Sequence, residues 1–228
     1  MILAQIAPFA FVMEKVTGFI QLVINQREAL QVALQQHMLL VAVPVGAAIV
    51  VAIPLGIWAT RHKYVQMLAI GFANIMQTVP SLALIALMIP IGLGIGRRPA
   101  YVALFLYAIL PILRNTYAGI SGVDESLKRA ARGMGMTDLQ VLRKVELPLA
   151  MPIIMAGLRT STVMIIGTAV LAAYVAGGGL GTFIMTGLGL IRDDLILLGA
   201  IPSAGLALVA DFVLGRLESW VTPTGLKV

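Results

Sequence analysis

Long apolar runs with almost no charge dominate this chain of 228 residues. Several of them exceed about 18 residues, the length above which an apolar run becomes a candidate for crossing a bilayer as an α-helix. The chain is 60% hydrophobic and only 11% charged, whereas about 25% of the residues of a soluble domain are charged. Its mean hydropathy is +0.99. The runs therefore predict an all-α polytopic membrane protein.

About five transmembrane helices are expected from the lengths of these runs. They cover about residues 38–59, 65–90, 100–119, 152–176 and 195–215. Pro44 and Pro54 predict kinks in the first of them. Residues 1–34 are apolar but interrupted by charged and amide side chains, so we interpret them as an external segment lying on the membrane surface. His37 and His62, at the ends of the first run, are expected at the membrane interface.

One polar stretch, residues 123–160, interrupts the apolar sequence. It predicts two short helices joined at Gly135, the second capped by Thr137 or Asp138. Apolar residues repeat every three or four positions in each helix, at Leu127, Ala130, Ala131 and Met134 and then at Leu139, Leu142 and Val145;. Such a loop either presents a surface to something outside the bilayer or is a solvated connector.

The same stretch resembles the signature loop of the membrane subunits of binding-protein-dependent ABC importers. That signature is Glu-Ala-Ala, three residues, Gly, nine residues, an aliphatic residue, any residue and Leu-Pro. The matching positions are Arg129, Ala130, Ala131, Gly135, Val145, Leu147 and Pro148. Arg129 departs from the pattern, because the family usually has glutamate there.

The resemblance extends over roughly residues 35–220 and implies a transmembrane permease domain there. The loop at about residues 120–151 would be its coupling loop, and residues 221–228 a cytoplasmic tail. The sequence segments ARGMGMT, VELPLAMPIIMAGLRT and IGTAVLAAYVAGGGLG are similar to those of the branch that imports glycine betaine, carnitine, choline and related osmoprotectants. An importer of the same architecture for another small solute, such as an amino acid, remains an alternative.

The resemblance also implies partners. A second permease copy or a similar subunit would complete the pathway, two ATPase subunits would bind ATP and Mg, and an external solute-binding protein would deliver the solute. This chain would be a non-catalytic subunit without a cofactor of its own. The glycines at 177–181 do not form a phosphate loop, because no Gly-Lys-Ser/Thr follows them;.

Lysine and arginine positions predict the orientation. With the coupling loop inside, nine basic residues lie at cytoplasmic ends and five at outer ends, as the positive-inside rule requires. The N-terminus is then outside and the C-terminus inside the cytoplasmic membrane of a prokaryote. The net charge of +6 flanks the apolar runs, which indicates contact with lipid headgroups rather than with nucleic acid.

Polar side chains inside the apolar runs are the candidates for a translocation pathway. The predicted set is Asn74, Gln77, Thr78, Ser81, Asn115, Thr160 and Thr168. Gln77 and Ser81 are four positions apart and would share one helical face. The alternative is that these groups only form hydrogen bonds between helices.

Two opposite charges, Arg159 and Asp211, fall inside predicted spans at similar depth. We expect an ion pair between them, with Arg114 as the alternative partner of Asp211, because a lone charge at this depth is costly. Asp211 is also the one candidate for a coupling-ion site if the protein is a self-sufficient carrier or channel. No metal-spaced cluster and no catalytic constellation is present in the sequence.

Overall fold

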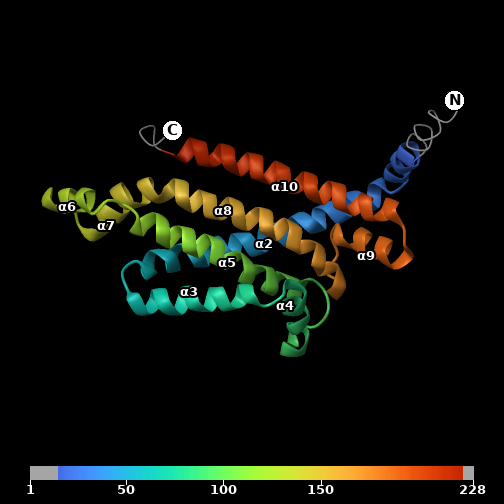
Figure 1. Cartoon of the computed structure of the whole chain (residues 1–228), viewed down its shortest axis with the longest axis horizontal. Coiled ribbons are helices and arrows are strands. Elements are labelled where there is room, and N and C mark those ends of the chain that lie inside the picture. Colours follow the sequence, from blue (N-terminus) through green and yellow to red (C-terminus); the bar gives the residue numbers. More distant parts are fainter. Residues whose placement is uncertain (1–14, 223–228) are drawn as a thin grey trace, which may run out of the picture.

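A computed structural model of the chain describes residues 15–222, and all its elements are helical. Residues 15–25 are helical and lead into α2. The long helices are α2 (Arg27–Ala59), α5 (Arg97–Ser121), α8 (Leu147–Ala169) and α10 (Asp193–Val221). The shorter ones are α3 (Lys63–Thr78), α4 (Ser81–Leu87), η1 (Ile89–Leu93), α6 (Glu125–Gly133), α7 (Asp138–Val141), η2 (Leu142–Glu146), η3 (Val170–Val175) and α9 (Gly181–Leu190). Figure 1 shows α10, α8, α5 and α3 side by side.

Four helices of the described chain are long and apolar enough to cross a membrane, and a fifth span results if α3 and the segment from α4 through η1 are counted as one. This agrees with the expected number of about five spans when the bent pair is counted as one. The first is longer than expected, because α2 begins at Arg27 rather than near residue 38. The surface position of residues 1–34 stays a prediction, and residues 1–14 and 223–228 lie outside the described part.

The expected span over residues 65–90 is not one continuous helix. The chain bends by 101° between α3 and α4. Val79 has an extended backbone (φ −72°, ψ 128°), because the ring of the following Pro80 disfavours helical geometry at the preceding residue. Gln77 therefore ends one helix while Ser81 begins the next, and the two do not share a helical face.

Helix α5 is the centre of the bundle and packs against α2 and α8 (Figure 1). Small residues let these helices approach closely. A Cβ at Gly157 of α8 would lie 2.5 Å from Cβ of Asn115, and one at Gly56 of α2 would lie 2.7 Å from Cβ of Thr116. The centre of the bundle therefore consists of two tight helix crossings on two adjacent sides of α5.

His37, expected at the membrane interface, is packed inside this bundle. It is fully buried, and its Nε2 lies 3.1 Å from the carbonyl oxygen of Ile166 in α8. It does not lie at a helix end, because α2 begins eleven residues, or about three turns, before the apolar run that was predicted as the span. His62, by contrast, is exposed at the start of α3.

The two ends of the bundle differ. Figure 1 shows α6 and α7 projecting beyond one end, on the side where α10 has its C-terminal end, and α4 and α9 toward the other end. Helices α2, α5 and α10 run toward the α6–α7 end and α8 runs away from it. This alternation fits the predicted topology.

Candidate functional site

The coupling loop projects from one end of the bundle as two capped helices. Asp124 caps α6, and its carboxylate accepts a hydrogen bond of 2.7 Å from the backbone N–H of Ser126. This bond holds the pKa of the Asp124 carboxyl below its usual value;. Thr137, rather than Asp138, caps α7 and forms a reciprocal capping box with Gln140;.

The turn between the two helices is held by conformation and by charge. Gly135 has φ +82°, a left-handed conformation that costs a residue with a Cβ about 1–2 kcal/mol. The guanidinium of Arg132 lies 3.4 Å from the carboxylates of both Glu125 in α6 and Asp138 in α7. The coupling loop therefore has a defined shape.

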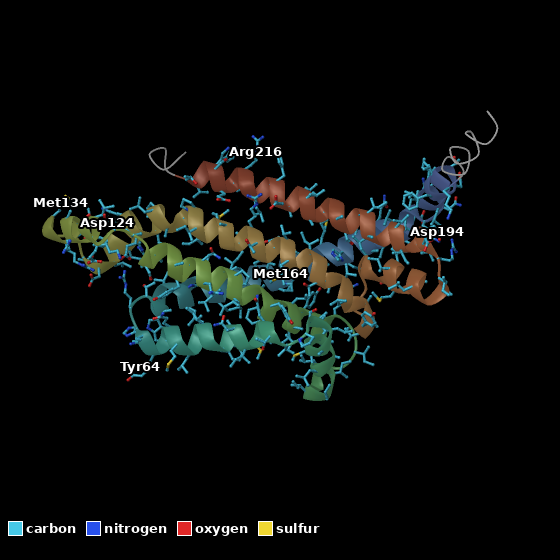
Figure 2. The ribbon with its side chains drawn as sticks, in the orientation of Figure 1. Tyr64, Asp124, Met134, Met164, Asp194 and Arg216 are labelled. Carbon is cyan, nitrogen blue, oxygen red and sulfur yellow. The ribbon has the colours of Figure 1, made fainter. Side chains whose placement is uncertain are left out.

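The predicted apolar faces of this loop are mostly not packed against the rest of the chain. Ala131 is 1% exposed, but Leu127, Met134 and Leu139 are 47%, 72% and 54% exposed. Figure 2 places Met134 at the far end of the molecule. We name Leu127, Met134 and Leu139 the apolar tip. The helices predicted from this spacing do form. The apolar side chains of the tip, however, point away from the rest of the chain.

The signature positions lie on both sides of this loop. Arg129, Ala130, Gly135 and Pro148 are exposed, Val145 and Leu147 are half-buried, and Ala131 is buried. Arg129, the departure from the family pattern, makes no ion pair with any residue between 15 and 222. Its charge therefore remains available at the surface.

A buried ion pair at the base of the coupling loop was missed. Glu146, the unspecified position of the signature, is 0% exposed, and its carboxylate binds the guanidinium of Arg61. Arg61 belongs to the connection between α2 and α3, so the pair ties that connection to the end of the coupling loop. An acid between two aliphatic residues, Val145 and Leu147, was the signal that sequence reasoning passed over.

The structure does not gather all seven predicted pathway residues at one place. Asn74 and Thr160 are exposed, and Ser81 is half-buried at the bend. The hydroxyls of Thr78 and Thr168 donate to carbonyl oxygens of their own helices. These residues give no single lining, because the bend at Pro80 separates α3 from α4.

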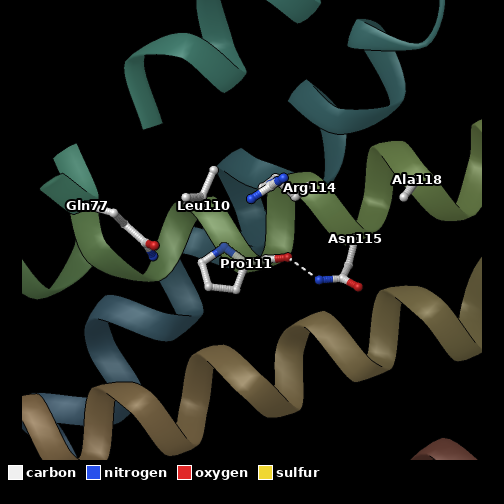
Figure 3. A pocket seen from close by; sticks show the side chains of 6 residues that line it. All are labelled: Gln77, Leu110, Pro111, Arg114, Asn115 and Ala118. Carbon is white, nitrogen blue, oxygen red and sulfur yellow. Dashed lines mark hydrogen bonds between the residues drawn. The ribbon is translucent and has the colours of Figure 1, made fainter. Parts of the chain in front are cut away.

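Gln77 and Asn115 both line one pocket of about 380 Å³ between α3 and α5. This volume lies within the range of small-molecule sites, about 300–1,000 Å³. Gln77 Nε2 donates to the carbonyl of Tyr107 at 3.3 Å, and Asn115 Nδ2 to that of Pro111 at 2.8 Å. Figure 3 shows the six lining side chains: Gln77, Leu110, Pro111, Arg114, Asn115 and Ala118.

Arg159 and Asp211 lie together between α8 and α10. The distances are 2.5 Å from Arg159 Nε to Asp211 Oδ1 and 2.6 Å from the terminal nitrogen to Oδ2, a two-point contact. Glu218, about two turns further along the same face of α10, lies 3.8 Å from the same guanidinium. Arg114, the alternative partner, lines the pocket on α5 instead.

Comparison with known proteins finds membrane transport proteins, in agreement with the bundle of apolar helices. Residues 52–223 match the family model described as the binding-protein-dependent transport system inner membrane component. The glycine betaine/carnitine/choline transport system permease protein OpuCB of Bacillus subtilis is 50% identical over 84% of this chain and 88% of its own length. The osmoprotectant import permease protein OsmW of Salmonella typhimurium is 43% identical over 84% of this chain and 91% of its own length.

Solved structures show the same fold. A chain of the MetNI methionine ABC transporter, solved in inward facing conformations, superposes with a TM-score of 0.75 over 85% of this chain and 96% of that chain, at 24% identity. With the family model covering residues 52–223, the spans and the projecting coupling loop identify the chain as a member of the binding-protein-dependent transport system inner membrane component family.

Proposed function

We propose that this chain is the permease subunit of an ATP-driven importer and forms the pathway for a small quaternary ammonium osmoprotectant of the glycine betaine, carnitine or choline type. The coupling loop is the observation that carries the permease role, and the similarity to the glycine betaine/carnitine/choline permease protein supports the solute class. Its two helices are fixed by caps and by Arg132, yet Leu127, Met134 and Leu139 remain exposed at its tip. A rigid loop with an apolar tip is suited to dock into a partner.

The partners follow from this arrangement. Two ATPase subunits, which hold ATP and Mg, would dock on the apolar tip from the cytoplasm, and an external binding protein would deliver the solute at the opposite end. A second copy or a similar subunit would complete the pathway. The C-terminus then lies inside and the N-terminus outside the cytoplasmic membrane.

The mechanism would be alternating access. Closure of the ATPase dimer on ATP moves the docked coupling loop, and the spans rock as rigid bodies so that the pathway opens on the other side. A self-sufficient carrier would need a coupling-ion site, for which Asp211 was the candidate. Both Asp211 oxygens are bonded to Arg159, which favours the importer over the carrier.

The test uses the permease together with its ATPase and binding protein in proteoliposomes. Replacing Gly135 with leucine forces a left-handed conformation on a residue with a Cβ and displaces α7;. We expect solute-stimulated ATP hydrolysis and solute uptake to be lost, while circular dichroism shows the spans still folded. Gly133→Leu is the matched control, because Gly133 is helical and nothing lies within 4 Å of its Cβ position.

Normal transport by the Gly135→Leu protein would contradict the docking role of the loop. Uptake of labelled glycine betaine, carnitine and choline by the parent complex tests the solute class directly. If the parent complex hydrolyses ATP but imports none of the three, the assignment to quaternary ammonium solutes is wrong.

A further inference from the structure

The pocket between α3 and α5 holds an arginine without a counter-ion. Arg114 is exposed in this pocket, and it makes no ion pair or side-chain hydrogen bond within the described residues. It precedes Ser121, the end of α5, by seven positions, which places it about 10 Å inside the helix end. A charge at this depth of a span is costly and is usually retained for a pathway or a ligand.

Arg114 differs from Arg159, which has an acidic partner. Arg159 is the other arginine well inside a span, and its guanidinium is held by both oxygens of Asp211. No acidic side chain lines the pocket of Arg114. The guanidinium therefore presents its donors to whatever occupies that pocket.

The two amides of the pocket present the opposite kind of group. The N–H groups of Gln77 and Asn115 are directed at the carbonyl oxygens of Tyr107 and Pro111, and Figure 3 shows the second of these bonds. Their side-chain oxygens accept no hydrogen bond within residues 15–222. The pocket is thus lined by the cationic guanidinium of Arg114, which donates hydrogen bonds, and by the amide oxygens of Gln77 and Asn115, which carry partial negative charge.

We infer that Arg114 binds the carboxylate of a zwitterionic solute in this pocket, while the amide oxygens of Gln77 and Asn115 face its quaternary ammonium group. The inference rests on the proposed function and narrows its solute class. Guanidinium binds carboxylate at two points. Glycine betaine and carnitine carry such a carboxylate. Choline has a hydroxyl instead, so Arg114 offers it no counter-charge and repels its cation.

The test uses the chain's lack of cysteine. Ala118, exposed in the pocket one turn beyond Arg114, is replaced by cysteine in the permease–ATPase complex in nanodiscs, without binding protein. The rate of its reaction with a small polar thiol reagent is measured against increasing glycine betaine and choline. We expect glycine betaine to slow the reaction at a concentration about tenfold lower than choline, because a hydrogen bond to a charged group is worth about one factor of ten or more.

Adding Arg114→Gln should raise the half-protecting concentration of glycine betaine about tenfold and leave that of choline unchanged or lower. Arg216→Gln is the matched control. Like Arg114 in α5, Arg216 is an exposed arginine near the C-terminal end of its helix, α10, but it stacks on Phe212 outside the pocket. We expect it to leave both protection curves unchanged.

Equal protection by the two solutes, protection by neither, or glycine betaine protection that survives Arg114→Gln would each overturn the inference. If Arg114→Gln does not assemble, the comparison of the two solutes on the parent pocket still decides it. Uptake by the complete parent complex separates this inference from the proposed function: if uptake is present but Arg114-dependent protection is absent, only the inference fails.

Discussion

The ion pair between Arg61 and Glu146 gives the sharpest test of how the coupling loop is attached. The Glu146 side chain is 0% exposed and that of Arg61 is 37% exposed. Glu146 Oε1 has no hydrogen-bond partner in the described structure. Replacing Arg61 with alanine would therefore leave a buried carboxylate with no cation and with one oxygen already unsatisfied.

The magnitude follows from this burial. Removing one partner of a buried pair costs about 3–5 kcal/mol, and we expect the lower end, about 3 kcal/mol, because Arg61 is partly exposed to water;. For a chain of this size 1 kcal/mol corresponds to about 2–4 °C in Tm. Arg61→Ala should thus lower the melting temperature in detergent by about 6–12 °C.

A second substitution separates this cause from a general loss of packing. Adding Glu146→Gln to Arg61→Ala removes the buried charge, so we expect most of the lost stability to return, to within about 1.5 kcal/mol of the parent. Arg143→Ala is the control, because Arg143 is an exposed base on the same segment η2, and it should change stability by less than about 0.5 kcal/mol. An Arg61→Ala protein as stable as the control, or a double variant no more stable than Arg61→Ala, would refute the reasoning.

Two further predictions concern the spans. Asp211→Asn should weaken the contact with Arg159 and lower stability in detergent, since the pair joins α8 to α10, yet leave ATP-driven uptake without a new pH dependence; a stable variant that loses uptake through a pH-sensitive step would instead point to ion coupling. Cysteines at Asn74 and Gln77 should react with a small polar thiol reagent at rates that change with ATP, whereas protection in every state would indicate a hydrogen-bonded bundle.

Sequence periodicity and length were sufficient for the number of long helices and for the coupling loop, because both depend on local signals, but not for the start of α2. The apolar runs, Gly135 and Thr137 all act within one or two turns of the chain. The bend at Pro80 was harder to predict, because proline alone does not separate a kink from a break. Pro111 and Pro152 lie inside continuous helices, where packing against neighbouring helices compensates for the lost hydrogen bond.

Contacts between distant segments were predicted only where chemistry left few choices. Arg159 and Asp211 were paired in advance because opposite charges inside adjacent spans need partners. The partner of Glu146 is 85 positions away, in a connection that sequence alone does not place beside the coupling loop. The pocket at Arg114 was missed for a related reason, since its lining depends on which face of α5 turns toward α3.

The packing suggests which parts move together when the coupling loop is displaced. Helix α8 follows the coupling loop without a break, and its Gly157 lies so close to α5 that even a methyl group there would clash with Asn115. We therefore expect α5 and α8 to move as one body. The connection that precedes α3 is tied to the base of the loop through Arg61, and α3 ends at the bend before Pro80. A movement of the loop would then change the spacing between α5 and α3, which are the two walls of the pocket that contains Arg114.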